Sequence, residues 1–184
     1  MNKIGIFVDT CDLYHKIQRN FGQGSKICFN NYLIDIDDGE LIMAFAYGMR
    51  SESLGFPKYL QSLGFTTKFK PPRIYNIGDR QIKKCDWNIT MVIDIIKACT
   101  EKKLDTVILG SSNGLLLPLI SYLRDQGITV LVKASGIPDS LNSAANSVFE
   151  FSEKHLETEG NDTERISKQS ESFCPTYSNI HGSD

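Results

Sequence analysis

The chain has 184 residues, enough for one domain with a substantial core, and its net charge of −2, with 41% hydrophobic and 23% charged residues, is that of a globular protein. The apolar runs have the length of core strands or helices, which argues against a membrane span, and the N-terminus lacks the longer apolar region of a signal peptide. Five cysteines without a CxxC spacing argue against a disulfide framework and a zinc site, so we expect a cytoplasmic protein with reduced thiols.

The first predicted element is a buried parallel strand at residues 3–10 (KIGIFVDT), an apolar, β-branched run that ends in an acid. Leu13, Ile17 and Phe21 then follow at four-residue spacing, as on one face of a helix, and Gly22 fits the end of that helix. Further along, the patterns predict a buried strand at 40–48, a short helix at 53–64 and a strand at 65–70.

A longer helix is predicted for the segment DWNITMVIDIIKACTEKK, with Asp86 as its N-cap and an apolar stripe formed by Ile89, Val92, Ile93 and Ile96. The remaining elements are a strand at 105–110, a helix at 114–127 with Pro118 in its first turn, a strand at 128–134, and a short helix and a strand within 140–151. Because strands alternate with helices, we expect an α/β fold with a central, mostly parallel sheet.

Charge is divided unevenly along the chain. Residues 153–184 hold seven acids and three bases and are rich in Ser, Thr and Glu, which leaves the first 152 residues at about +2. Low hydrophobicity combined with excess charge is typical of segments that do not fold. We therefore expect one domain at 1–152 and an acidic, flexible tail at 153–184.

A basic stretch from Thr66 to Lys84 contains six bases and one acid, Asp79. Such a cluster favours a surface that faces phosphates, with a solvated loop as the alternative. Tyr75 and Trp87 lie in or beside this stretch and are candidates for stacking on unpaired bases, and Trp87 is equally suited to packing. The candidate RNA-binding residues of this region are Lys68, Lys70, Arg73, Lys83, Lys84 and Trp87.

Oxygen-bearing side chains are expected at one edge of the sheet, because ligands of open α/β sheets bind at the carboxyl ends of the strands. Asp9 and Asp12 follow the first strand, and Ser111, Ser112 and Asn113 follow the central one. Such oxygens are the ligands that Mg²⁺ or Mn²⁺ prefers. The long helix can bring further ones to this edge, from Asp86, Asn88 or Asp94.

Four segments follow one another within residues 4–151: FVDTCDLY, KKCDWNITMVID, DTVILGSSNGLLLPLISYLRDQGITVLV and SLNSAANSVFEF. In this order they resemble the NYN domain, a PIN-like family related to metal-dependent ribonucleases. The resemblance implies a three-layer α/β/α fold in which carboxylates hold divalent metal for phosphodiester hydrolysis. Asp9, Asp86 and Asp94 match acids of the family, and Asp12 stands where the family often has Asn.

The departures from the family pattern lie where the chemistry would occur. Asn88 occupies a position that is usually Asp, and Asn113 and Leu115 replace the two acids of the family's Ser-Gly-Asp-x-Asp-Phe motif. Ser112 replaces the glycine of that motif, and Asn146 stands where the final segment usually has Asp. Asn keeps an oxygen without the charge and Leu keeps neither, so we expect Mg²⁺ or Mn²⁺ to bind weakly if it binds.

These substitutions favour an RNA-binding or regulatory pseudo-nuclease. One alternative is an active Mg²⁺- or Mn²⁺-dependent endoribonuclease with a reduced acid set. Another is a scaffold or oligomerisation protein, with a homo-oligomer or a protein partner and no membrane. The candidate residues are Asp9, Asp86, Asp94 and Asn113 for catalysis, Asp9, Asp12 and Asn88 for metal, and, in addition to the basic stretch, Ser111 and Ser112 for an RNA phosphate.

Overall fold

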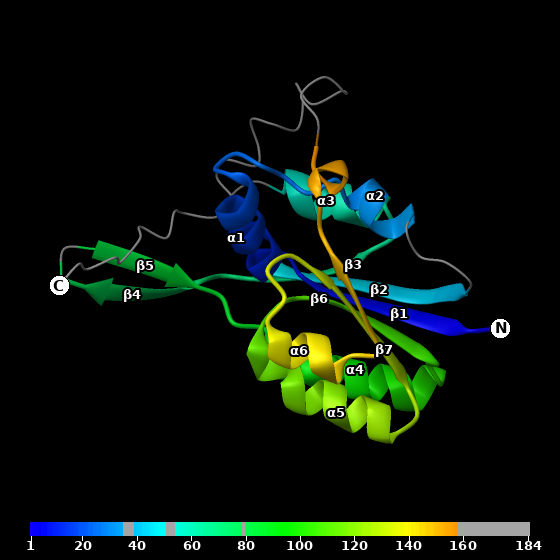
Figure 1. Ribbon diagram of the computed structural model, residues 1–184. Coiled ribbons are helices and arrows are strands. Elements are labelled where there is room, and N and C mark those ends of the chain that lie inside the picture. Colours follow the sequence, from blue (N-terminus) through cyan, green and yellow to red (C-terminus); the bar gives the residue numbers. More distant parts are fainter. Residues whose placement is uncertain (35–38, 51–53, 79, 158–184) are drawn as a thin grey trace.

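The computed structural model describes residues 1–34, 39–50, 54–78 and 80–157. In these residues one parallel sheet, shown in Figure 1, has the strand order β3-β2-β1-β6-β7-β8. Its strands are β1 (Lys3–Asp9), β2 (Glu40–Met49), β3 (Thr66–Lys70), β6 (Thr106–Gly110), β7 (Thr129–Ala134) and β8 (Ser147–Glu150).

Helices cover both faces of this sheet, which confirms the expected three-layer α/β fold (Figure 1). The helices that lead from β1 to β3 lie on one face: α1 (Thr10–Phe21), α2 (Phe29–Ile34) and α3 (Gly55–Ser62). The later helices lie on the other face: α4 (Asn88–Lys102), α5 (Leu117–Asp125), which follows the short 3-10 helix η1 (Gly114–Leu116), and α6 (Asp139–Ala144).

The central strand β1 is buried on both sides, because helices cover both faces of the sheet. Ile4, Ile6, Phe7 and Val8 are at most 2% exposed, which explains the uninterrupted apolar run. Strand order reverses between β1 and its neighbour β6. In sheets of this type the carboxyl ends of the strands at such a reversal form the crevice in which ligands bind, so Asp9 at the end of β1 marks the candidate site.

A two-stranded hairpin of β4 (Arg73–Ile77) and β5 (Arg80–Lys84) projects from the sheet on the left of Figure 1. Every residue of β4 is exposed. The sequence pattern predicted a basic surface or a loop here, and the hairpin was not predicted. Asp79, the acid of this stretch, lies outside the described residues.

Helix α4 begins one residue later than predicted. Its N-cap residue is Trp87, so the prediction of Asp86 as N-cap was wrong. The Asp86 carboxylate still stabilises the N-terminus of α4, because it accepts a hydrogen bond from the N–H of Asn88, the first residue of the helix, at 2.9 Å.

The face of α4 that packs on the sheet also differs from the predicted stripe. Met91, Ile95 and Ala98 are the buried residues, whereas Ile89 is 77% exposed and Ile93 is 46% exposed. Apolar residues surround the first turns of this helix, so the spacing alone was compatible with two different faces. Tertiary packing selects the face that continues from the buried Trp87.

The chain remains packed on the domain beyond β8. The 3-10 helix η2 (Glu153–His155) follows, His155 is 1% exposed, and Leu156 pairs with Ile27 in an antiparallel bridge. The packed domain therefore continues past its predicted end, while residues 158–184 lie outside the described residues and the tail there stays a prediction. In the described part of the chain, no helix combines the length and the apolar character needed to cross a bilayer.

Candidate functional site

A cleft of about 350 Å³ opens at the carboxyl end of β1, between α1, the start of α4 and the base of the hairpin. It brings together residues that are far apart in the sequence, including most of the predicted acids and amides. The residues that line it are Asp9, Cys11, Asp12, His15, Met49, Lys83, Lys84, Cys85, Asp86, Asn88, Asn113 and Leu115.

Asp9 ends β1 and caps α1. Its Oδ1 accepts hydrogen bonds from the N–H groups of Cys11 at 3.0 Å and Asp12 at 3.1 Å. The side chain is only 6% exposed, and this burial raises the pKa of Asp9 to about 7; the charges of Asp12 and Asp86 act in the same direction, and the two N–H bonds oppose it. Asp9 therefore changes charge near neutral pH.

Asp12 ties α1 to the loop that follows β6. Its Oδ2 accepts hydrogen bonds from the Ser111 hydroxyl at 2.9 Å, the Ser112 N–H at 2.7 Å and the Ser112 hydroxyl at 3.3 Å. Both serines are buried. Because their donors already serve Asp12, Ser111 and Ser112 have the arrangement of a satisfied turn and not that of a loop open to phosphate.

Replacing Asp12 with Ala should lower the free energy of unfolding by about 2 kcal/mol, because three donors at a partly buried site lose a charged acceptor. Urea denaturation at neutral pH would measure this loss. Asp125→Ala, at an exposed position in the last turn of α5, provides the matched control. Equal stability of the two variants would mean that Asp12 does not join α1 to the β6 loop.

Asn88 and Asn113 bind each other across the cleft. The Asn113 Nδ2 donates a hydrogen bond to the Asn88 Oδ1 at 3.0 Å. The Asn113 Oδ1 accepts a further bond from the Leu115 N–H at 3.1 Å and so caps η1. The two amides thus hold the start of α4 against the β6 loop at positions where the family resemblance leads us to expect carboxylates.

Asp94 does not line the cleft. Its Oδ2 accepts a hydrogen bond from the Tyr47 hydroxyl at 2.8 Å and forms an ion pair with the Lys68 Nζ at 2.7 Å. Burial, followed by the contact with Asp94, raises the pKa of Tyr47. The structure therefore separates Asp94 from the other predicted catalytic residues and offsets the charge of Lys68, which was predicted to meet RNA.

Trp87 is a packing residue in this structure. It is 7% exposed, and its indole N–H donates a hydrogen bond to the Gly48 carbonyl at 3.0 Å. The Lys70 ammonium lies 4.0 Å from the indole ring centroid and donates to the Asp86 carbonyl. Of the predicted RNA-binding residues in the basic stretch, Lys83 and Lys84 are exposed and line the cleft, and Arg73 is exposed on the hairpin opposite Lys84.

Four residues of the cleft were not predicted from the sequence: Cys11, His15, Met49 and Cys85. For His15 a signal existed, since it follows Asp12 by three positions on a predicted helix and therefore shares its face. Met49 carried no such signal. Asn146, named as a family departure, lies elsewhere: its Oδ1 accepts a hydrogen bond from the Val130 N–H near the start of β7, at the opposite edge of the sheet.

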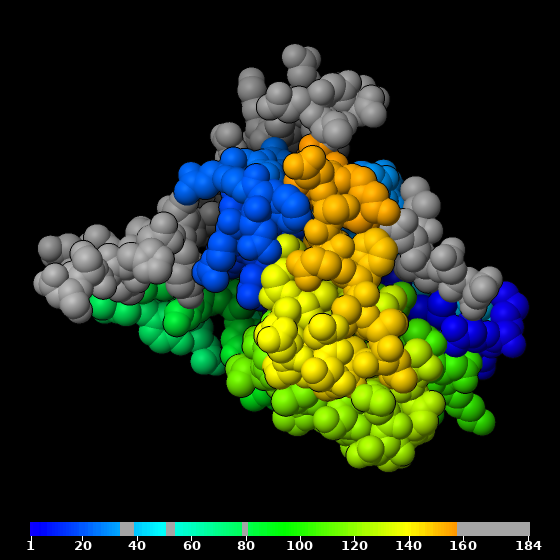
Figure 2. All heavy atoms as spheres, viewed as in Figure 1, coloured from blue at the N-terminus to red at the C-terminus, as the bar shows by residue number. Residues whose placement is uncertain are grey.

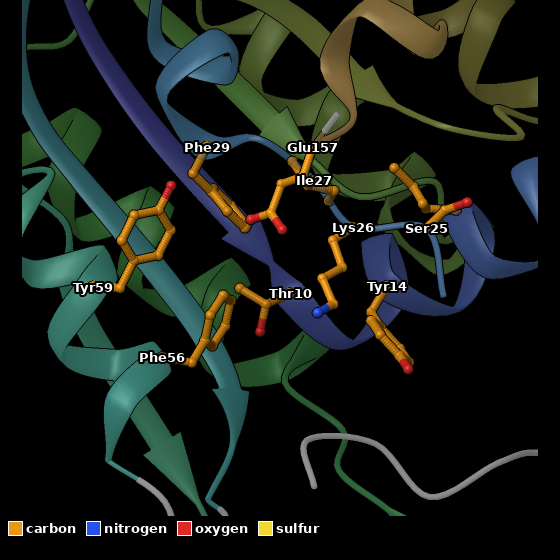
Figure 3. A pocket seen from close by; sticks show the side chains of 10 residues that line it. Thr10, Tyr14, Ser25, Lys26, Ile27, Phe29, Phe56, Tyr59 and Glu157 are labelled. Atoms are coloured by element: carbon orange, nitrogen blue, oxygen red, sulfur yellow. The ribbon is translucent and has the colours of Figure 1, made fainter. Parts of the chain in front are cut away.

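A second hollow, shown in Figure 3, lies beside α1. Its volume is about 60 Å³, and aromatic rings from Tyr14, Phe29, Phe56 and Tyr59 form much of its lining. Glu157 also lines it, and burial raises the pKa of that carboxyl. A hollow of this size is well below the roughly 300 Å³ of a small-molecule site, so the Asp9 cleft is the better candidate.

The side chains in the cleft do not fit a pair of metal ions held by carboxylates. Among the residues that the structure describes, no three His, Cys, Asp or Glu side chains are close enough together to hold an ion. One oxygen of Asp9 caps α1, the serines occupy one oxygen of Asp12, and Asn88 and Asn113 are bonded to each other.

Comparison with solved structures finds a protein of unknown function from Vibrio parahaemolyticus, with a TM-score of 0.73 and 23% sequence identity over 85% of this chain and 96% of that chain. At this identity the likeness shows a shared fold alone. MurG from Acinetobacter baumannii has a TM-score of 0.39 and 12% identity, with coverage of 86% of this chain and 44% of that chain, which is too little similarity to show a shared fold. Comparison with curated proteins finds no match.

The family comparison covers most of the chain. The NYN domain matches residues 3–153, a range that runs from the first strand to the start of η2 and contains the whole cleft. The central parallel sheet between two layers of helices agrees with this match. The chain belongs to the NYN domain family.

Proposed function

We propose that this protein binds RNA in the Asp9 cleft and does not cleave it. The observation that carries the proposal is the hydrogen bond between Asn88 and Asn113 at 3.0 Å. Two ionised carboxylates at that distance would repel each other until a cation or a shared proton lay between them, whereas two amides attract each other. The cleft is therefore stable without the metal that the family's hydrolytic chemistry needs.

The charges around the cleft support RNA as the partner. Lys83 and Lys84 stand at its rim and supply positive charge for phosphates. Asp9 carries only part of its negative charge at neutral pH, and three donors offset that of Asp12. A phosphate backbone therefore meets less repulsion than it would in a cleft filled with free carboxylates.

A second candidate function is that of an active endoribonuclease with a reduced acid set. The observation that favours it is that Asp9, Asp12 and Asp86 all line one cleft. A single Mg²⁺ or Mn²⁺ is often bound by one or two carboxylates together with water.

The expected cytoplasmic location, and a homo-oligomer or protein partner, stay predictions.

The two candidates differ in one experiment. Purified protein and its Asp9→Asn variant are incubated with end-labelled, partly structured RNA in Mn²⁺, Mg²⁺ or EDTA, and RNA binding in EDTA is measured by gel shift. Shifted but intact RNA in every condition is the expected result. Metal-dependent cuts that disappear in the variant would establish the second candidate. No RNA binding at low salt, together with a defined oligomer in light scattering, would favour a scaffold.

Replacing Lys83 and Lys84 together with Ala should weaken RNA binding and make it less sensitive to salt. Loss of two phosphate contacts should reduce the slope of log K against log salt by about 1.4 for a single strand. Fluorescence anisotropy over a series of salt concentrations would measure this slope. Lys3→Ala with Lys102→Ala removes the same charge at the opposite edge of the sheet and should leave the slope unchanged.

A further inference from the structure

The hairpin of β4 and β5 exposes apolar side chains without a core of its own. Ile74 is 54% exposed, Tyr75 is 44% exposed and Ile77 is 62% exposed. In the space-filling view of Figure 2, green atoms of this segment are visible on the left side of the molecule. Isolated two-stranded sheets are marginally stable in water, so such an exposed arm is expected to gain stability from a binding partner.

The base of the hairpin is fixed to the rim of the Asp9 cleft. Just before the hairpin, at the end of β3, the Lys70 carbonyl accepts a hydrogen bond from the Arg50 N–H at 2.8 Å, and the Lys70 ammonium donates to the Asp86 carbonyl. After the exit strand, Trp87 is bonded to Gly48. These contacts, just before β4 and just after β5, hold the arm in a defined direction relative to the cleft.

One face of the hairpin continues into the lining of the cleft. In the antiparallel register Tyr75 is opposite Ile82, and Arg73 is opposite Lys84. Directly opposed residues share a face, and so do residues two positions apart, which places all four on the same face. Since Lys84 also lines the cleft, an aromatic ring, an apolar contact and two cations follow one another towards Asp9.

This combination identifies the partner by its chemistry. Residues 73–84 hold four bases and one acid, so a second copy laid on the same face would bring like charges together. A single-stranded nucleic acid instead offers phosphates to the cations and flat, apolar base faces to Tyr75. Bases in a duplex already stack on their neighbours, so their faces are not available to the ring.

From these observations we infer that the hairpin is an arm that guides unpaired RNA into the Asp9 cleft, with one base stacked on Tyr75. The inference rests on the proposed RNA binding and adds a selection for single strands. The arm favours single-stranded over double-stranded RNA, and Tyr75 supplies that preference. Lys83 and Lys84 supply the salt-dependent part of the binding free energy, which is present for both single-stranded and double-stranded RNA.

The test measures binding of a labelled single-stranded RNA, and of its blunt duplex, by fluorescence anisotropy in EDTA. Tyr75→Ala should weaken binding of the single strand about tenfold, as expected for loss of one stacked base, and should leave duplex binding unchanged. Tyr75→Phe should retain the affinity. Tyr122→Ala removes an equally exposed tyrosine from α5 and is the matched control.

The outcomes separate this inference from the function on which it rests. If the unaltered protein binds no RNA at low salt, the proposed function fails. If it binds RNA through Lys83 and Lys84 but Tyr75→Ala behaves like Tyr122→Ala, or the duplex binds as tightly as the single strand, the proposed function stands and the arm is not a guide. A dimer in light scattering that Tyr75→Ala dissolves would assign the arm to a second copy and overturn the inference.

Discussion

Asp9→Asn is expected to stabilise the folded protein by roughly 2–4 kcal/mol at pH 8, because burial of the carboxylate in the cleft opposes its ionisation. The pKa of Asp9 is about 7 in the folded protein, against 3.8 for the unperturbed group. Between these values the unfolded chain loses its proton first, so stability falls as pH rises. Asn avoids this cost and is itself a good N-cap residue.

Thermal unfolding of both proteins from pH 4 to pH 8, in EDTA, would measure the effect. The two melting temperatures should be similar near pH 4 and should diverge up to about pH 7, with a final gain of roughly 5–10 °C for the variant. Asp125→Asn, at an exposed position on α5, should give no such divergence. A constant difference between Asp9→Asn and the unaltered protein at all pH values would contradict the raised pKa.

Such a result would also bear on function. A buried carboxylate that costs stability is typical of a position kept for chemistry or binding, not for folding. It would further ensure that any loss of RNA cleavage or binding in Asp9→Asn reflects the site, because the variant would be the more stable protein.

The sheet and most helices followed from sequence because each has a single dominant pattern. The strand predicted at 3–10 is apolar from Ile4 to Val8, and parallel strands buried on both faces require such a run. The hairpin was missed although Gly78-Asp79, a dipeptide typical of tight turns, separates the runs RIYNI and RQIKK. Its high charge suggested a surface, and an exposed arm has no buried face to reveal it.

The candidate site was less predictable, since chain topology places a residue at an edge of the sheet but does not choose its contacts. Asp86 and Asp94 belong to the same segment, yet Asp86 lines the cleft while Asp94 is bonded to Tyr47 and Lys68. That choice depends on strand β3 lying beside β2, which no local pattern shows. The hydrogen bond between Asn88 and Asn113 could not be predicted for the same reason, because no local pattern shows that these two side chains meet.

Restoring acids at the paired amides should have the reverse effect of Asp9→Asn. Asn88→Asp combined with Asn113→Asp places two carboxylates where the amides lie 3.0 Å apart, near Asp86 and Asp9. In EDTA at pH 8 their repulsion should lower the free energy of unfolding by about 3 kcal/mol. Mn²⁺ should recover much of this loss, whereas it should change the melting temperature of the unaltered protein little.

The matched control is Asn30→Asp with Asn142→Asp, which adds the same charge at exposed positions and should respond to neither EDTA nor Mn²⁺. RNA cleavage gained only by the double variant at the paired amides would mean that the fold keeps the geometry of a nuclease and that Asn88 and Asn113 are what silence it. A large Mn²⁺ response in the unaltered protein would contradict the proposed function, because the remaining aspartates would then bind metal without help.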